Sequence, residues 1–326
     1  MLKNEILNIL ERKKGAVVTG GQLANTLGVS RNAVWKAIHV LKNEGKQIMS
    51  VPNIGYRLLE SDDALSEQLI RSKLSTSFIG RHLKILPTVH STNQHLKELE
   101  TENIENGFTV IADEQVQGRG RRSRTFISAK GEGIYLSVLL KLSGKQHDIR
   151  LLTICAAVAV SKAVESVCRI DAEIKWVNDV CCKGKKICGI LTEAILSGEL
   201  QELDTVIIGI GINTGAIPPE IQEIATSVKE ETGMCGIRND LTAELLNRLE
   251  AVYLDCAANG KAHDIIKYYE SRLFIKGRQV FVVNPDTEYA ATVIGIDNDG
   301  ALIVKNDEGT IQHVVTGEIK LKRGQS

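Results

Sequence analysis

Five short, mostly apolar stretches in the middle of the chain constrain its fold most strongly: residues 108–112, 134–140, 173–177, 187–195 and 206–212. Runs of this length and composition are typical of strands that are buried on both faces of a sheet. Helical spacing predicts a central Ala- and Val-rich helix over 151–168 and further helices over 241–258 and 263–274. The middle of the chain is therefore predicted to be an α/β (α+β) domain, in which helices cover a sheet.

The first sixty residues follow a different pattern. Helices are predicted over 2–10, 22–27 and 31–43, and two short strands over 48–51 and 56–59. Between the second and third helices, Gly28 can reverse the chain, Val29 can plug the turn and Ser30 can cap the next helix. Two helices joined by such a turn, followed by a two-stranded wing, predict a winged helix-turn-helix.

The charge of this segment indicates a polyanionic partner. Residues 1–60 carry nine Lys and Arg against four Asp and Glu, although the whole chain has 40 of each. Arg and Asn side chains read guanine and adenine edges, and Lys suits phosphate. The predicted DNA-binding residues are Ser30, Arg31, Asn32, Lys36, His39 and Arg57. A small protein-interaction domain with a solvated basic face is the alternative.

From residue 277 onwards the pattern changes again. Short strands are predicted over 279–283, 290–296, 301–304 and 311–315, with turn sequences rich in Asn, Asp and Gly between them. This pattern predicts a small all-β barrel or sandwich. The predicted domains are thus a winged helix-turn-helix over 1–60, an α/β domain over 61–274 and a small β domain over 275–326.

Composition indicates the cellular compartment in which the protein is expected. A run of about 18 apolar residues is absent, so no membrane span is expected. The seven cysteines are an odd number and form no C-x-x-C pair. A reduced, cytoplasmic protein is therefore expected.

The segment 118–124 reads GRGRRSR and holds four arginines in seven positions. Glycines let backbone amides approach a phosphate, and guanidinium groups bind phosphate oxygens in pairs. The segment lies between two predicted strands, so it is expected to be a loop above the sheet that binds phosphate. A solvated basic tract is the alternative.

Three further motifs lie at strand ends. KWVND at 175–179 offers a cation, an amide and a carboxylate, and Lys186 precedes the strand at 187–195. The segment 209–215 reads GIGINTG, but two prolines follow it where a dinucleotide-binding motif needs a helix. The sequence GxxxxGK[ST] is absent, so any ATP is held without a P-loop.

These motifs, in this order and together with S-T-N at 91–93 and Gln115, resemble those of the biotin–protein ligases. With the helix-turn-helix, the chain resembles from end to end the bifunctional bacterial form, in which a biotin operon repressor is fused to biotin–[acetyl-CoA-carboxylase] ligase. Three positions depart from the family pattern: Ser123 replaces a common Gly, Val177 a common Pro and Phe126 a common Trp.

The resemblance implies that 61–274 is the catalytic domain and that the small β domain over 275–326 is an SH3-like β-barrel. It also implies roles for individual residues. Lys186 and Arg121 are implied as catalytic, and Asp179 as a ligand of Mg²⁺. The implied biotin site comprises Ser91, Thr92, Asn93, Gln115, Arg119, Gly120, Arg121 and Lys186. The implied ATP site comprises Arg121, Arg122, Arg124, Phe126, Lys175, Asn178, Asp179 and Asn213.

The resemblance also implies an activity and partners. ATP would activate biotin to biotinyl-5′-AMP, and a lysine of the biotin carboxyl carrier protein of acetyl-CoA carboxylase would accept the biotin. As corepressor, biotinyl-5′-AMP would favour a homodimer that binds operator DNA through residues 1–60. The alternatives are a lipoate or octanoate ligase, a ligand-sensing repressor without catalysis, and a ligase whose helix-turn-helix does not bind DNA.

Overall fold

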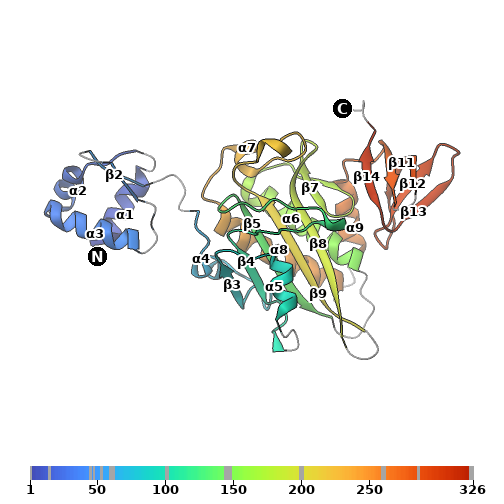
Figure 1. The fold of residues 1–326 in the computed structure, drawn as a ribbon, viewed down its shortest axis with the longest axis horizontal. Coiled ribbons are helices and arrows are strands. Elements are labelled where there is room, and N and C mark those ends of the chain that lie inside the picture. The colour runs from blue at the N-terminus through green and yellow to red at the C-terminus, as the bar shows by residue number, and fades with distance from the viewer. Residues whose placement is uncertain are drawn as a thin grey trace. The chain divides into compact units, whose positions relative to one another are not determined.

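The computed structural model divides the chain into two compact units, Met1–Ala64 and Leu65–Ser326, drawn together in Figure 1. The structure describes residues 2–13, 16–43, 46, 48–51, 54–58, 63–99, 103–142, 149–197, 202–257, 262–284 and 287–322. Each unit is described by itself.

The first unit contains the predicted winged helix-turn-helix. Its elements are α1 (Leu2–Arg12), α2 (Gly20–Leu27), α3 (Arg31–Asn43), β1 (Ile48–Val51) and β2 (Gly55–Leu58). Gly28 ends α2 with φ 64°, a conformation that a glycine adopts without steric cost. As predicted, Ser30 caps α3: its Oγ accepts a hydrogen bond of 3.2 Å from the backbone N of Ala33.

The second unit is built on a mixed seven-stranded sheet with the order β3-β4-β5-β9-β8-β7-β6. Its strands are β3 (Leu83–Leu86), β4 (Thr109–Ala112), β5 (Gly133–Lys141), β6 (Glu173–Lys175), β7 (Asp179–Cys182), β8 (Lys185–Ser197) and β9 (Glu202–Asn213). The β3–β4 pair is parallel and the other five pairs are antiparallel. The apolar runs are therefore buried because helices cover both faces, although the strands are mostly antiparallel.

The helices of this unit are α4 (Glu67–Ser72), α5 (Thr92–Glu98), α6 (Ile149–Cys168), α7 (Val228–Thr232), α8 (Arg238–Ala257) and α9 (Ala262–Ser271). On one face of the sheet, α6 packs against β8 and α8. On the other face, Leu96 of α5 packs with Val110, Leu139 and Ile207. The alternation of side chains along each strand separates these two clusters.

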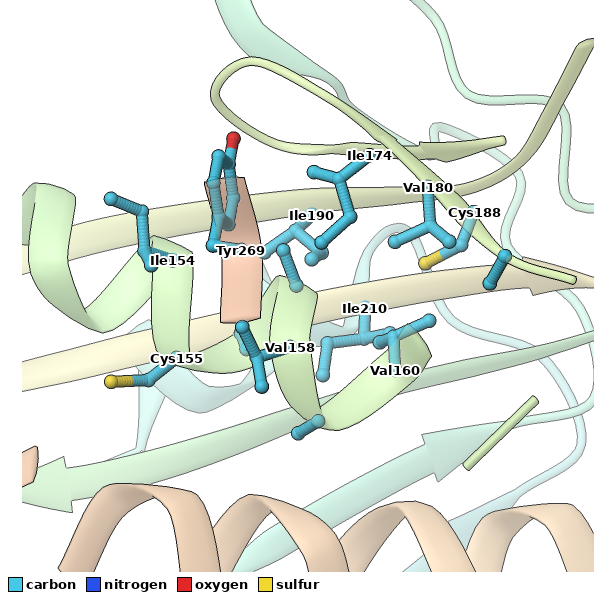
Figure 2. Packing of buried hydrophobic residues seen from close by; sticks show 14 of the residues in the cluster. Ile154, Cys155, Val158, Val160, Ile174, Val180, Cys188, Ile190, Ile210 and Tyr269 are labelled. Carbon is cyan, nitrogen blue, oxygen red and sulfur yellow. The ribbon is translucent and has the colours of Figure 1, made fainter. Parts of the chain in front are cut away.

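Helix α6 is the centre of the main core. By length and composition it could cross a membrane, but 72% of its most apolar window is buried inside the fold. Figure 2 shows Ile154, Val158 and Val160 of this helix beside Ile190 and Ile210 of the sheet and Tyr269 of α9. Its hydrophobicity is therefore explained by burial in the protein core.

The last part of the chain forms a five-stranded antiparallel sheet with the order β13-β12-β11-β10-β14. Its strands are β10 (Gln279–Val283), β11 (Glu288–Ile296), β12 (Leu302–Asn306), β13 (Ile311–Val314) and β14 (Glu318–Leu321). The turn before β12 contacts the segment between β6 and β7, because the buried indole of Trp176 donates a hydrogen bond of 3.0 Å to the carbonyl oxygen of Gly300. The small β domain is thus confirmed, with β14 as an additional strand.

Candidate active site

A cavity of about 810 Å³ lies in the second unit. Every residue predicted for the biotin and ATP sites lines it: Ser91, Thr92, Asn93, Gln115, Arg119, Gly120, Arg121, Arg122, Arg124, Phe126, Lys175, Asn178, Asp179, Lys186 and Asn213. These residues come from segments that are far apart in the sequence. The fold therefore gathers all of the predicted ligand-binding residues in one place.

Glycines on two adjacent strands form part of the cavity wall. Gly189 of β8 pairs with Gly211 of β9. A Cβ added at Gly211 would lie 2.5 Å from the Phe126 ring, and one added at Gly209 would lie 2.2 Å from Asn93 Oδ1. Gly209 and Gly211 thus lie within β9 and make room for neighbouring side chains, so the segment does not open a helix as a dinucleotide-binding motif does.

Hydrogen bonds hold the start of α5 in position. Gln115 Oε1 accepts from the backbone N of Thr92 at 2.9 Å, and Gln115 Nε2 donates to Ser128 Oγ at 2.8 Å. Ser137 Oγ lies 2.5 Å from Asn93 Oδ1 and 2.6 Å from Thr92 Oγ1. Three of the predicted biotin-site residues, Thr92, Asn93 and Gln115, therefore belong to one hydrogen-bond network.

Ser137 and Glu193 are members of this network that sequence reasoning missed. Asn93 Nδ2 donates to Glu193 Oε2 at 2.7 Å, and Glu193 also pairs with Lys97 at 2.7 Å. Ser137 is a polar residue within the otherwise apolar stretch 134–140, and Glu193 is a charged residue within the mostly apolar stretch 187–195. A polar residue in a strand that is expected to be buried could have indicated a functional network, because a buried polar group needs a hydrogen-bond partner.

The arginine-rich segment forms a tight loop. Phe126 N donates to the carbonyl oxygen of Gly118 at 2.9 Å, and Gly120 N donates to that of Arg124 at 2.7 Å. Arg121 is half-buried, and burial together with the nearby charge of Arg122 lowers the pKa of its guanidinium. Its Nη1 donates to Asn178 Oδ1 at 3.4 Å. A concentrated positive charge therefore faces the cavity.

The outer arginines of this loop contact the small β domain. Arg124 Nη2 lies 2.5 Å from Glu318 Oε2, and Arg122 Nη2 donates to the carbonyl oxygen of Val283 at 3.2 Å. Glu318 and its neighbours in β14 line the same cavity. Sequence reasoning missed Glu318, since its strand follows the last one predicted. In this structure its carboxylate partly neutralises the loop.

Lys186 faces the cavity from β8. Its Nζ lies 2.7 Å from Asp179 Oδ1 and 5.8 Å from the centroid of the Phe126 ring. Its backbone N also donates to the carbonyl oxygen of Ile224 at 2.9 Å. Asn178 Nδ2, from the same motif as Asp179, donates to the carbonyl oxygen of Ile190 at 2.9 Å. Strand pairing thus positions the lysine and the carboxylate together.

In the first unit, the predicted DNA-binding residues of α3 share one exposed surface. Arg31, Asn32, Lys36 and His39 are all exposed. Ser30 is exposed as well, and its side chain caps the helix. Arg57 on β2 is half-buried. The helix residues therefore have the accessibility that reading a groove needs, whereas Arg57 is less accessible.

Comparison with known proteins identifies the family. The model of the biotin/lipoate A/B protein ligase family matches residues 85–213, an HTH domain matches 3–57, and the biotin protein ligase C-terminal domain matches 276–322. The "Bifunctional ligase/repressor BirA" of Bacillus spizizenii is 34% identical over 98% of both chains. The protein of that name from Escherichia coli is 30% identical over 95% of both. This chain belongs to the biotin–protein ligase family.

A solved structure of this ligase family supports the assignment. The biotin protein ligase from Aquifex aeolicus in complex with biotin and ATP is 30% identical, and it covers 75% of this chain and 100% of its own. The TM-score is 0.65. The fold predicted from the sequence is therefore confirmed.

The magnesium site predicted at Asp179 can be tested against the oxygen donors that the structure places there. Among the described residues, no group of three or more His, Cys, Asp and Glu could hold a metal ion. Magnesium is commonly bound by one or two carboxylates together with substrate phosphates and water. The carboxylate of Asp179 lines the cavity, so the residues present fit an ion that is held largely by the triphosphate.

Proposed function

We propose that this protein activates biotin with ATP, transfers the biotin to a lysine of a carrier protein, and represses transcription when it holds the activated biotin. The observation that carries the ligase activity is the cavity, in which Arg121, Lys186 and the buried Ser-Thr-Asn network lie together. The family assignment over nearly the whole chain supports both activities. The carrier is proposed to be the biotin carrier protein of acetyl-CoA carboxylase. A relative from Mycobacterium tuberculosis is named as a biotin–[acetyl-CoA-carboxylase] ligase.

The first step joins two anions. A carboxylate oxygen of biotin attacks the α-phosphorus of ATP, a new O–P bond forms, and the bond to the β-phosphate bridging oxygen breaks. Pyrophosphate leaves with the electron pair, and biotinyl-5′-AMP remains. Arg121 and Lys186 offset the negative charge that develops on the phosphorus oxygens. Mg²⁺ at Asp179 would supply further positive charge to the phosphates.

Lys186 has a second task in this proposal. Its ammonium is now paired with Asp179 at 2.7 Å. A bound biotin carboxylate would place a second anion beside it, so Lys186 would orient the attacking oxygen. The neighbouring Phe126 ring and the strand glycines would hold the apolar part of biotin. The loop of arginines over the cavity would keep water from the mixed anhydride.

The second step releases AMP. The neutral amine of the carrier lysine attacks the acyl carbon of biotinyl-5′-AMP, an amide bond forms, and the bond from the acyl carbon to the phosphate oxygen breaks. The amine loses one proton to solvent or to a basic side chain. A covalent intermediate with the enzyme is not required.

Pyrophosphate release tests the ligase proposal. Biotin should stimulate release from ATP by the wild type, and Arg121→Ala should reduce it by about 10²-fold, since it removes one charge that stabilises the transition state. The matched control is Arg248→Ala, which removes an arginine that pairs with Glu244 on α8 and does not line the cavity. Release with lipoate or octanoate but not with biotin would contradict the proposal, and so would no release with any acid.

The repressor activity is proposed to depend on the activated biotin. Biotinyl-5′-AMP would act as corepressor by favouring a homodimer, and the dimer would present two copies of α3 to a palindromic operator. Carrier protein that consumes the biotin would relieve repression. All seven cysteines are free, which suits the cytoplasm as the place where both activities occur.

A further inference from the structure

An exposed tryptophan stands on the surface proposed to bind DNA. Trp35 of α3 is 54% exposed, and among the described residues it is the one aromatic side chain within the set of exposed large apolar groups. The other tryptophan of the chain, Trp176, is 4% exposed and hydrogen-bonded to Gly300. An exposed indole presents a large apolar area to water, so covering it with a partner is favourable in free energy.

The position of Trp35 on the helix is central to the basic surface. Arg31, Trp35 and His39 follow one another at four-residue intervals, so they form one stripe along α3. The rings of Trp35 and His39 lie 5.6 Å apart between centroids. Val34 and Ile38 lie on the adjoining side of α3 and are buried in the core of the unit, whereas Trp35 is not among the residues of that core. Trp35 therefore does not serve the core of its own unit.

The charges around Trp35 favour a nucleic acid as the partner. Lys36 is its exposed neighbour in the chain, and Arg31 lies one turn before it. An apolar protein surface would remove these cations from water without compensation. A duplex offers phosphates to the cations and, in the major groove, the 5-methyl group of thymine to the indole.

We infer that Trp35 enters the major groove and contacts a thymine methyl group, which makes it a specificity-determining residue of the operator complex. The inference rests on the proposed DNA binding and deepens it. The first turns of a recognition helix contact base edges, and Trp35 is the fifth residue of α3. Trp35 thus adds an apolar determinant to the polar residues predicted from the sequence.

Uracil substitution tests this contact directly. The full chain, supplied with biotin and ATP, first selects a tight-binding duplex from a random-sequence library. The duplex is then resynthesised with each thymine in turn replaced by uracil, which lacks only the methyl group. At one or two positions, the wild type should lose about fourfold in affinity, the equivalent of one buried methyl group. Trp35→Ala should bind more weakly and show no loss at those positions.

Two further measurements make the result specific. Val40→Ala removes an exposed apolar side chain from the end of the same helix, outside the stripe, and should keep the wild-type affinity and the uracil effect. Acrylamide should quench the fluorescence of Trp35 in the free protein, and the duplex should protect it. Trp35→Phe should leave only the shielded emission of Trp176, which identifies the source of the signal.

The outcomes separate this inference from the proposed function. Duplex binding that weakens with salt but is indifferent to uracil and to Trp35→Ala would overturn the inference and keep the DNA-binding proposal. An absence of duplex binding by the wild type, even at low salt, would overturn both. Loss of self-association in Trp35→Ala with an unchanged uracil effect would also overturn the inference, because it would assign Trp35 to a protein contact.

Discussion

At the scale of single residues, Ser137 connects the strand core to the ligand cavity. Its side chain is fully buried and lies within hydrogen-bond distance of Asn93 and Thr92. Ser137→Ala should destabilise the fold by about 1–3 kcal/mol, since it leaves a buried acceptor without its donor. We also expect the KM for biotin to rise about fivefold, because the start of α5 loses its support.

A second buried serine provides the matched control. Ser161 of α6 is fully buried, and its Oγ lies 3.3 Å from the hydroxyl of Tyr268, away from the cavity lining. Ser161→Ala should lower the melting temperature to a similar extent and leave the KM for biotin unchanged. Equal KM values for the two variants would show that Ser137 contributes to stability alone.

The site residues were predictable where they form a motif. Arg121, Lys186 and Asn93 belong to segments whose order in the chain resembles the family pattern, and all of them line the cavity. Ser137 and Glu318 were not predicted, because each acts through a partner that is far away in the sequence. Pairing of this kind is decided by the tertiary fold, which local patterns do not specify.

At the scale of elements, α7 supports the rim of the cavity. Glu231 of this helix pairs with Lys183 at 2.9 Å, and it accepts a hydrogen bond of 2.7 Å from Thr226. These hydrogen bonds lower the pKa of Glu231 below its ordinary 4.5. The backbone beside Thr226 runs along Lys186, since Lys186 N donates to the carbonyl oxygen of Ile224.

The lowered pKa of Glu231 predicts a dependence of stability on pH. As the pH falls, the unfolded chain binds the proton first, so this contribution is present above pH 4.5 and is lost below it as the folded group titrates. Glu231→Gln should therefore be less stable at pH 7, and the difference should shrink below pH 4.5. Melting temperatures from pH 3.5 to 7 measure this. Glu220→Gln, at an exposed position, should show no such trend.

Long elements were predicted more accurately than short ones. The helix predicted over 151–168 is α6 (Ile149–Cys168), and the strand predicted over 134–140 lies within the nine-residue strand β5 (Gly133–Lys141). By contrast β3, β7, β14, α4, α5 and α7 were missed, each of them seven residues or fewer. Asp179 was predicted to lie just after the end of the strand over 173–177, whereas it begins the next strand, β7. In such short segments tertiary pairing overrides local preference.

At the scale of the whole molecule, the chemistry depends on parts of the second unit that are separate in sequence. The cavity wall includes residues of α5, of the arginine loop and of β14. Glu318 of β14 holds Arg124, so the small β domain contacts the loop that is proposed to close over the reactants. In the proposed function, activated biotin bound in this cavity would contact several elements at once, and it would act as a corepressor if these elements bind it more tightly in the DNA-binding state.

The final prediction concerns coupling between this cavity and DNA binding. If biotinyl-5′-AMP is the corepressor, biotin with ATP should raise the affinity for the selected duplex by about 5- to 150-fold, whereas ATP alone should not. By thermodynamic reciprocity, saturating duplex should tighten the binding of biotinyl-5′-AMP by the same factor. Fluorescence anisotropy of labelled duplex and equilibrium dialysis of biotinyl-5′-AMP measure these two affinities.

The control for this coupling is Arg121→Ala, which should form biotinyl-5′-AMP poorly but should regain the tighter duplex binding when biotinyl-5′-AMP is added directly. Equal duplex affinity with and without biotinyl-5′-AMP would leave the ligase intact and contradict the corepressor.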